Sequence, residues 1–132
     1  MFRFRINNKE VCYDDGLNLL RILRDQEKLT AAKDGCSEGA CGTCMVLVDG
    51  KAVRACLQRP SRLEGKSVIT VEGLTDREKE VYAYAFSKLG AVQCGVCIPG
   101  LVISAKGLLD QNDRPTREEG KQAIKGNICR CT

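Results

Sequence analysis

Three cysteines within ten residues constrain this chain more than any other feature of its sequence. The stretch GCSEGACGTC, residues 35–44, places Cys36, Cys41 and Cys44 in the spacing C-x4-C-x2-C, and Cys56 is the next cysteine along the chain. Small domains with many cysteines are usually stabilised by disulfides or by a metal. The chain has nine cysteines, and this odd number argues against a framework made only of disulfides. We therefore expect thiolate ligands of a metal centre in this stretch.

The spacing of these four residues is typical of a plant-type [2Fe–2S] cluster, which is held by four cysteine thiolates. Gly35, Gly39 and Gly42 let the loop bend inward and turn backbone N–H groups toward the sulfur atoms, where a Cβ atom would crowd them. Such hydrogen bonds raise the reduction potential because they stabilise the added electron. The four candidate ligands are called the N-terminal cysteine set: Cys36, Cys41, Cys44 and Cys56.

Four further cysteines form two close pairs in the second half of the chain. Cys94 and Cys97 are spaced as C-x2-C, and Cys129 and Cys131 as C-x-C. This C-terminal cysteine set provides four thiolates for one site, and its spacing alone fits either structural zinc or an iron–sulfur cluster. The chain contains no histidine, which excludes mixed Cys/His zinc sites and Rieske-type clusters and removes the commonest general base.

The remaining cysteine, Cys12, lies in a predicted strand near EVCYDD and belongs to neither set. Free cysteine is among the most buried residue types and behaves as a small apolar residue. We therefore expect Cys12 to be buried and to be dispensable for metal binding.

The first part of the chain predicts a sheet domain. Apolar and polar residues alternate in FRFRI, which a turn-prone pair of asparagines follows, so residues 2–13 are predicted to form a β-hairpin. The leucines of DDGLNLLRILRDQ have helical spacing. Asp49 and Gly50 mark a second hairpin within CMVLVDGKAVRAC, and KSVITVEG is one more strand. These elements predict a small α+β domain over residues 1–73.

The second part of the chain predicts only helices. Thr75 with Glu78, and Thr116 with Glu119, each have the spacing of a capping box at a helix N-terminus. Between them, the apolar stretch PGLVISAKGLLDQN opens with a proline, which suits the first turn of a helix. We therefore expect residues 74–132 to form a small all-α domain.

Several functional classes find no support in the sequence. No stretch reaches the roughly 18 apolar residues of a membrane span, and the N-terminus lacks the apolar core of a secretory signal, so we expect a cytoplasmic protein. The net charge of +4 is spread along the chain without a basic patch, which argues against nucleic-acid binding. The carboxylate pairs Asp14-Asp15 and Glu118-Glu119 suit turn and helix N-terminal positions rather than catalysis.

Three segments together resemble the iron–sulfur subunit of the molybdenum hydroxylases, the family of xanthine dehydrogenase, aldehyde oxidoreductase and carbon monoxide dehydrogenase. These segments are GCSEGACGTCMVLVDGKAVRAC, QCGVCIPG and GNICRCT. The resemblance runs nearly end to end and implies an α+β fold, in which a β-grasp ferredoxin-like domain (residues 1–73) precedes a small all-α helical bundle domain (residues 74–132). It also implies one [2Fe–2S] cluster per domain, an exposed cluster on the N-terminal cysteine set and an inner cluster on the C-terminal set.

The resemblance also implies partners for the chain. In this family the inner cluster lies beside the pterin of a molybdenum cofactor, which a separate large subunit or domain holds. Gln93 and Cys131 match the positions that approach this pterin. We therefore expect a hetero-oligomer with a large molybdopterin-binding subunit and an FAD-binding subunit, and neither nucleic acid nor membrane as a partner.

The sequence departs from the family pattern at two positions. Ile98 stands where a threonine is usual; a threonine hydroxyl would cap the helix entered at Pro99, and the loss of a cap costs about 1 kcal/mol. The chain stops at Thr132, where relatives usually continue with a Gly-Tyr pair and a short tail. Such an end is also expected of a segment of a longer chain, so the resemblance does not extend to the C-terminal contacts that the family makes with the cofactor subunit.

The leading interpretation is the electron-transfer subunit of an oxidoreductase complex, which itself breaks no substrate bonds. Electrons left on molybdenum after substrate hydroxylation would pass to the inner cluster, then to the exposed cluster, and then to a flavin or an external acceptor. Two alternatives stay open: a freely diffusing ferredoxin with one functional cluster, and a structural or binding module with zinc in its helical half. The second cysteine set argues against the ferredoxin, and a visible absorption spectrum distinguishes iron–sulfur from zinc, which is colourless.

Overall fold

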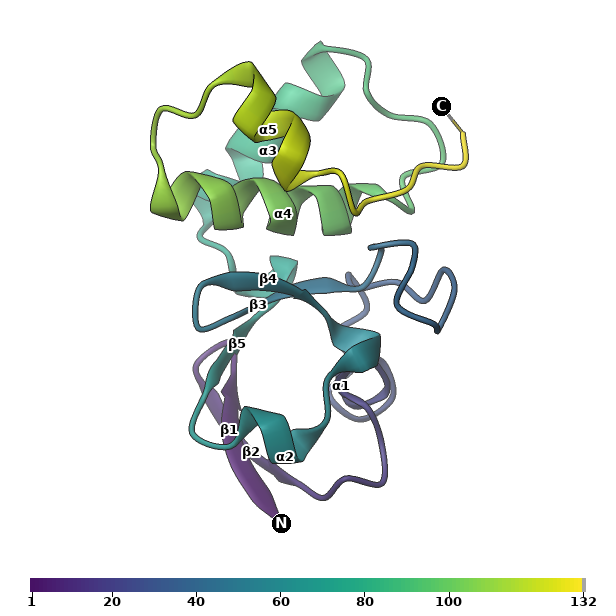
Figure 1. The fold of residues 1–132 in the computed structure, drawn as a ribbon, viewed down its shortest axis with the longest axis vertical. Helices are drawn as coiled ribbons and strands as arrows, with labels where there is room; N and C mark the ends of the chain where they lie inside the picture. Colours follow the sequence, from purple (N-terminus) through teal and green to yellow (C-terminus); the bar gives the residue numbers. More distant parts are fainter. Residues whose placement is uncertain (132) are drawn as a thin grey trace.

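The computed structural model of the chain describes residues 1–131, in which a sheet-containing part precedes a helical part (Figure 1). The strands are β1 (Phe2–Ile6), β2 (Lys9–Tyr13), β3 (Met45–Val48), β4 (Lys51–Arg54) and β5 (Ser67–Ile69). The α-helices are α1 (Leu19–Arg21), α2 (Pro60–Leu63), α3 (Asp76–Lys88), α4 (Ile98–Gln111) and α5 (Arg117–Ala123). Shorter turns are the π-helical η1 (Ile22–Gln26) and the 3-10 helical η2 (Ala55–Leu57) and η3 (Val71–Gly73).

The strands form one mixed sheet in the order β2-β1-β5-β3-β4. β1 pairs antiparallel with β2, with Phe4 opposite Val11, and it pairs in parallel with β5. β3 pairs antiparallel with both β4 and β5. Asp49 (φ 49°) and Gly50 (φ 85°) adopt the left-handed conformation that a tight hairpin turn requires, as their sequence predicted. With a helical segment packed against one face, this sheet has the predicted β-grasp arrangement.

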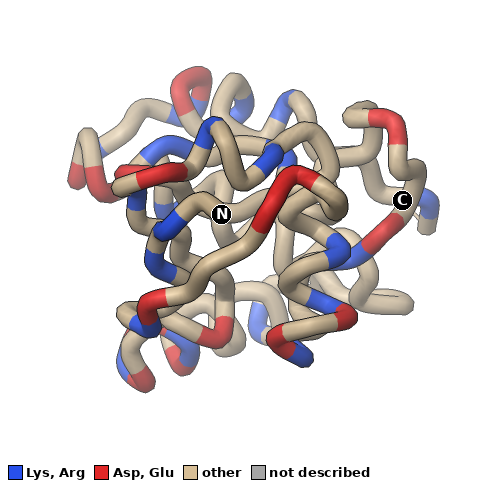
Figure 2. The backbone as a smooth tube through the Cα atoms, turned by 90° about the horizontal axis from the view of Figure 1, so that it is seen from below, with Lys and Arg blue, Asp and Glu red and all other residues tan. Residues whose placement is uncertain are grey.

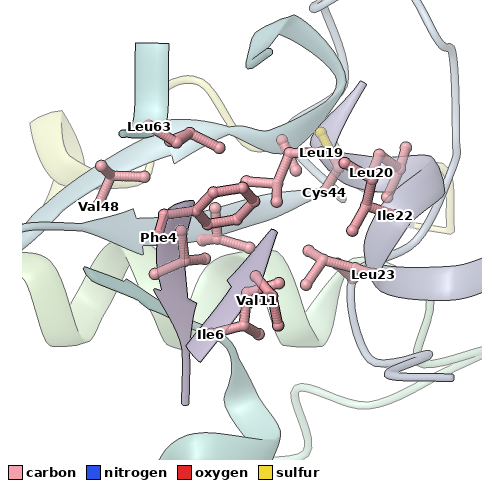
Figure 3. Packing of buried hydrophobic residues seen from close by; sticks show 14 residues of the cluster. Phe4, Ile6, Val11, Leu19, Leu20, Ile22, Leu23, Cys44, Val48 and Leu63 are labelled. Carbon is pink, nitrogen blue, oxygen red and sulfur yellow. The ribbon is translucent and has the colours of Figure 1, made fainter. Parts of the chain in front are cut away.

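The core of the sheet part lies between the sheet and the segment formed by α1 and η1 (Figure 3). Leu19, Leu20 and Leu23, whose spacing predicted a helix, are all buried and pack in one cluster with Phe4 and Val48 of the sheet. Burying one such side chain contributes about 1.5 to 3 kcal/mol. This cluster therefore fixes the sheet and, with it, the loop that carries the first cysteines.

The helical segment that the leucines predicted is wound in two ways. α1 begins after Asn18, whose side-chain oxygen accepts the N–H of Arg21 at 3.0 Å. The chain then continues as the π-helical turn η1, in which Ile22 and Leu23 are both fully buried. The sequence predicted a helix here but not this change of winding, because leucine spacing over so short a segment does not distinguish the two.

Cys12 is exposed, so the prediction that it is buried was wrong. Successive side chains of a strand point to opposite faces of the sheet. In β2 the inward positions belong to Val11, which is buried, and Tyr13, which is half-buried. The alternation of the strand therefore outweighs the tendency of free cysteine to be buried.

Both predicted capping boxes are present in the helical part. The hydroxyl of Thr75 accepts the N–H of Glu78 at 3.1 Å, and the Glu78 carboxylate accepts the N–H of Thr75 at 3.1 Å. Thr116 and Glu119 make the same two hydrogen bonds at the start of α5. Each box satisfies two backbone N–H groups that have no partner within the helix. The start points of α3 and α5 are therefore encoded locally.

α4 begins with a different cap from the one that the sequence suggested. Its N-cap residue is Cys97, which makes no side-chain capping hydrogen bond, and Ile98 is already the first residue of the helix. A threonine at position 98 would therefore not occupy the N-cap, and the expectation that Ile98 deprives the helix of a cap was wrong. The side chain of Ile98 instead lines an apolar hollow with Tyr82 and Phe86 of α3.

α4 lies across β3 and β4 and joins the helical part to the sheet (Figure 1). Val46 and Val48 of β3 belong to the core shared with α1, whereas Leu47 between them contacts α4 on the other face. A Cβ atom at Gly107 of α4 would lie 3.3 Å from Cδ2 of Leu47, so helix and strand approach closely. β3 is therefore buried on both faces, by the core of the sheet part on one side and by α4 on the other.

At a second contact between the two parts, backbone approaches backbone closely. A Cβ atom at Gly42 would collide with the carbonyl oxygen of Gly126, and one at Gly100 would collide with the carbonyl oxygen of Gly42. Gly42 also has a φ of 75°, which side chains other than glycine rarely adopt. The loop of the N-terminal cysteine set is therefore packed directly against the segment that leads to Cys129.

Within residues 1–131, none of the helices has the length and apolar character that crossing a membrane requires. Basic and acidic residues are interspersed along the chain when the molecule is viewed from below (Figure 2). This view agrees with the prediction that the charge of the chain is not gathered into one basic patch.

Thr75→Ala should lower the free energy of unfolding by about 1 kcal/mol, because it removes the hydroxyl that caps α3. Thermal or denaturant unfolding measures the change. Ser87→Ala, an exposed substitution on the same helix, is the matched control and should cause no loss. Equal stability of Thr75→Ala and the unmodified chain would contradict the role given to this capping box.

Gly42→Ala should lower the melting temperature more than Gly90→Ala does. Both glycines have a positive φ, 75° and 68°, so each alanine bears the cost of about 1 to 2 kcal/mol of a left-handed conformation. Only at Gly42 would the added Cβ also meet a backbone oxygen, since nothing lies within 4 Å of that position at Gly90. Equal melting temperatures for the two variants would contradict the close backbone contact between the two parts.

Candidate metal centres

The loop that carries Cys36 and Cys41 directs backbone N–H groups at one sulfur atom. The Sγ of Cys36 accepts hydrogen bonds from the N–H groups of Ala40 and Cys41 at 3.3 Å each, and from that of Glu38 at 3.5 Å. The N–H groups of Glu38, Cys41 and Ala40 lower the pKa of the Cys36 thiol to about 7. The loop therefore stabilises negative charge on this sulfur, which a thiolate ligand of a metal requires.

The glycines of the loop make room for two different groups. A Cβ atom at Gly35 would lie 2.9 Å from the Sγ of Cys41, so this glycine leaves space for a sulfur atom, as the sequence predicted. A Cβ atom at Gly39 would lie 2.7 Å from Cδ1 of Leu57, so that glycine instead accommodates a side chain. Leu57 follows Cys56 directly and is 52% exposed.

Cys44 and Cys56 are brought together by the pairing of β3 with β4. Cys44 directly precedes β3, and the N–H of Ala55, which follows β4, donates to the Cys44 carbonyl at 3.2 Å. Burial raises the pKa of the Cys44 thiol to about 11, and the neighbouring thiol of Cys56 adds to this rise. Hydrogen bonding also links the side chains of Cys36 and Cys41. The N-terminal cysteine set is therefore arranged as two thiol pairs.

Thr43 lies next to these thiols, and the sequence analysis did not identify it. Its Oγ1 is 3.1 Å from the Sγ of Cys41 and donates a hydrogen bond to the carbonyl of Lys33 at 2.9 Å. The residue is 5% exposed, so its polar contacts are shielded from water. Its only signal in the sequence is its place between two cysteines, which does not reveal the direction of its side chain.

The C-terminal cysteine set is also arranged as two thiol pairs. The N–H of Val96 and the neighbouring side chain of Cys131 lower the pKa of the Cys94 thiol. Burial and a hydrogen bond with Cys129 raise the pKa of the Cys97 thiol. The short loop before α4 and the last residues of the chain therefore meet, although more than thirty positions separate them in sequence. Each pair takes one cysteine from each of these two segments.

Members of both cysteine sets line one cavity of about 400 Å³. Cys41 and Thr43 line it from the sheet part. Three members of the C-terminal set line it from the helical part: Cys94, Cys97 and Cys129. The segments that carry them lie on the same side of the molecule in Figure 1. The fold therefore brings both sets to one place without mixing their thiol pairs.

The arrangement of the thiols bears on the kind of metal centre that each set could hold. Among residues 1–131, no three cysteine or carboxylate side chains already surround one point closely enough to bind a single ion. A structural zinc needs four ligands around one ion. A [2Fe–2S] cluster contains two irons and is held by four thiolates, two on each iron. Neighbouring thiols within each set are compatible with the four-thiolate ligand set of a two-iron cluster.

Gln93 lies at the exposed end of the C-terminal set. Its Nε2 is 3.5 Å from the carbonyl oxygen of Cys131, at the outer limit of a hydrogen bond. Gln93, Cys94 and Cys131 are all exposed. The two residues that the resemblance placed near a pterin are therefore neighbours at the surface of the helical part.

Two family models match the chain and together cover nearly all of it. The model described as a 2Fe-2S iron-sulfur cluster binding domain matches residues 4–74. The model described as a [2Fe-2S] binding domain matches residues 70–132. The chain therefore has two cluster-binding domains in tandem, which excludes a ferredoxin with a single cluster-binding domain.

Relatives and solved structures agree with these matches. The nicotinate dehydrogenase small FeS subunit of Eubacterium barkeri is 41% identical over 125 residues, which cover 94% of this chain and 80% of the relative. The structure of quinoline 2-oxidoreductase from Pseudomonas putida 86 matches with a TM-score of 0.89 at 37% identity, covering 99% of this chain and 83% of that chain. The aldehyde oxidoreductase of Desulfovibrio desulfuricans matches with a TM-score of 0.89 at 40% identity.

The aldehyde oxidoreductase match covers 99% of this chain but only 15% of the longer one, so the same unit also occurs within a larger polypeptide. The sheet part, the helical part and the paired thiols all agree with the two domain types that the family models describe. By its fold, its domains and its relatives, the chain belongs to the [2Fe–2S] electron-transfer subunits of the molybdenum hydroxylases.

Proposed function

We propose that each cysteine set holds one [2Fe–2S] cluster and that each thiol pair binds one of its irons. The pairing of the thiols carries this proposal, because two pairs from one half of the chain are what a two-iron cluster needs. The ligands of the first cluster would be the N-terminal set: Cys36, Cys41, Cys44 and Cys56. The ligands of the second would be the C-terminal set: Cys94, Cys97, Cys129 and Cys131.

A bound [2Fe–2S] cluster supplies reversible one-electron oxidation and reduction. The residues of this chain would set how readily the electron is accepted. The three N–H groups directed at Cys36 stabilise negative charge, which favours the reduced form. Cys44 is only 3% exposed, whereas Cys94 and Cys131 lie at the surface. Because the two sets have such different surroundings, we expect two clusters with different reduction potentials.

The exposed end of the helical part is the proposed entry point for electrons. Gln93 and Cys131 lie there, and the geometry supports their placement beside a pterin that a large molybdopterin-binding subunit holds. Apolar side chains near this end are exposed to 45% or more: Leu89, Val92, Val96 and Ile128. Exposed apolar patches are typical of protein–protein contact. We infer that the large subunit covers this patch.

Electrons would leave through the loop of the N-terminal set. Ser37, Glu38 and Ala40 of this loop are exposed, so a partner can approach the first cluster closely. The cavity that Cys41 shares with three cysteines of the C-terminal set places the two sets next to each other, which supports electron transfer between the two clusters. We propose an FAD-binding subunit or an external acceptor at this end. The chain would then be one part of a hetero-oligomeric oxidoreductase of the xanthine dehydrogenase and aldehyde oxidoreductase type.

We also propose a domain boundary between residues 73 and 74. A β-grasp ferredoxin-like domain would span residues 1–73 and a helical domain residues 74–132. Two observations support this boundary: η3 ends at Gly73, and the capping box of α3 begins at Thr75. The two family models overlap only over residues 70–74, which includes the proposed boundary.

The proposed location is the cytoplasm, and no membrane or nucleic acid is proposed as a partner. In the view of Figure 2, basic and acidic residues alternate along the described part of the chain, which supports the proposal that nucleic acid is not a partner.

The full chain should contain about four irons and four acid-labile sulfides, because each [2Fe–2S] cluster contains two of each. Cys12→Ala should retain this content, since Cys12 is exposed on β2 and lies outside both thiol sets. Cys44→Ser is the matched comparison and should lose the iron of the first cluster. Elemental analysis and sulfide determination measure both. Two irons, stoichiometric zinc, or loss of iron in Cys12→Ala would overturn the ligand assignment.

Gln93→Leu should leave both clusters in place but slow the reduction of the inner cluster, or weaken retention of the molybdenum cofactor, in the assembled complex. The substitution keeps a similar volume and removes both hydrogen-bonding groups of the side chain. Gln122→Leu, on the exposed surface of α5, is the matched control. Stopped-flow reduction and molybdenum analysis decide between the outcomes. An unchanged rate together with full molybdenum content would place Gln93 outside the relay.

A further inference from the structure

One side chain connects the loop of the N-terminal cysteine set to the helical part. Asn127 lies in the segment between α5 and Cys129. Its Nδ2 donates a hydrogen bond to the carbonyl oxygen of Gly42 at 3.1 Å. Its Oδ1 accepts a hydrogen bond from the hydroxyl of Ser104, in α4, at 2.8 Å. The amide therefore bonds two separate parts of the chain. Its donor binds Gly42, 85 residues away in sequence, and its acceptor binds Ser104, 23 residues away.

The residues on both sides of Asn127 are fixed to the sheet part as well. The N–H of Ile128 donates to the carbonyl of Cys41 at 2.8 Å. The guanidinium of Arg54, at the end of β4, donates to the carbonyl of Gly126 at 3.1 Å. Three consecutive residues of this segment therefore each make a hydrogen bond to the sheet part of the molecule. A segment attached so closely cannot shift without moving the loop against which it packs.

The amide of Asn127 is held in one orientation. Ser104 is 2% exposed, and a buried hydroxyl without a hydrogen-bond partner is costly. Gly42 and Gly100 leave no room for a Cβ atom where the two parts meet, so the backbone of the loop lies directly against α4 and Asn127. Tight packing and two hydrogen bonds therefore fix the side chain between loop and helix.

The contact between Gly42 and Asn127 lies close in sequence to a cysteine of each set. Gly42 directly follows Cys41, and Asn127 lies two residues before Cys129. Cys41 and Cys129 line the same cavity from opposite sides. A change in the distance between Gly42 and Asn127 would therefore change the separation of the two sets, whereas the thiol pairs within each set would stay together.

We propose that Asn127 is a positioning residue for electron transfer between the two clusters. By joining Gly42 to Ser104, it fixes the distance and orientation of the exposed cluster relative to the inner cluster. This inference rests on the proposed ligand sets, and iron analysis of the unmodified chain tests those sets separately. Electron transfer through protein weakens steeply with distance, so a small displacement is expected to have a measurable effect.

The test compares three variants of the full chain with both clusters bound. Asn127→Asp keeps the acceptor for Ser104 but places a carboxylate oxygen against the Gly42 carbonyl, so the loop should be pushed away. Ser104→Ala removes the other anchor of the amide without introducing a charge. Asn8→Asp makes the same chemical change in the exposed turn between β1 and β2 and serves as the control.

Two measurements report on the separation of the clusters. The magnetic interaction between the reduced clusters, seen as splitting in electron paramagnetic resonance, falls with the cube of the distance between their spins. The rate of electron equilibration after pulsed reduction of one cluster gives the transfer step itself. We expect Asn127→Asp to weaken the splitting and to slow equilibration severalfold, Ser104→Ala to cause a smaller change in the same direction, and Asn8→Asp to cause none.

A structural role alone would give a different result. Asn127→Asp would then lower the melting temperature while splitting and equilibration rate stayed as in the unmodified chain, and this outcome overturns the proposal. Should Asn127→Asp fail to hold four irons, Ser104→Ala decides: weaker splitting supports the proposal and unchanged splitting overturns it. An unmodified chain without four irons would instead refute the ligand assignment on which the inference rests.

Discussion

The fold depends on a backbone contact between the loop after Cys41 and the segment before Cys129. A Cβ atom at Gly42 would collide with the carbonyl of Gly126, one at Gly100 would collide with the carbonyl of Gly42, and the N–H of Ile128 donates to the carbonyl of Cys41. Without this contact, the helical part would be joined to the sheet mainly through α4 and β3. With it, two cysteine sets that belong to different halves of the sequence lie across one cavity. A relay needs such a fixed and short separation of its redox centres.

The two cysteine sets differ in the hydrogen bonding and the burial of their thiols. The loop around Cys36 provides backbone donors, whose dipoles stabilise a thiolate, while burial makes the charged form of Cys44 unfavourable in the absence of a metal. A bound metal would offset the charge of a Cys44 thiolate and so favour its deprotonated form. The C-terminal set lies nearer the surface, where Cys94 and Cys131 are exposed. Cys44 of the first set is thus enclosed by its own chain, whereas the exposed thiols of the second set are open to a partner.

The sequence predicted the features that depend on local chemistry. The spacing of the cysteines indicated a thiolate site, the two Thr/Glu pairs predicted the starts of α3 and α5, and Asp49-Gly50 predicted a hairpin. Predictions from the sequence were wrong where one local tendency competes with another. The prediction for Cys12 relied on the usual burial of cysteine, although the alternation in β2 already pointed its side chain outward. The role given to Ile98 assumed a helix start one residue too late.

Contacts between distant segments could not be predicted from the sequence. The side chain of Asn127 meets a carbonyl 85 residues away, and nothing in the composition of GNICRCT indicates that direction. Thr43 was missed for the same reason, because a threonine between two cysteines can point toward either face of the loop. Glycine spacing showed that the loop bends, but it did not show that Gly42 packs against another part of the chain. Such contacts are set by packing between elements, which no local pattern records.

The central claim is that one chain carries two separate redox centres, one in each half. Reductive titration of the full chain, followed by spin integration in electron paramagnetic resonance, tests it most directly. Each [2Fe–2S] cluster takes up one electron and then becomes paramagnetic. We therefore expect uptake of two electrons per chain and two signals, each of one spin, that appear at different potentials. Uptake of a single electron with one signal would contradict it, because only one of the two cysteine sets would then hold a cluster.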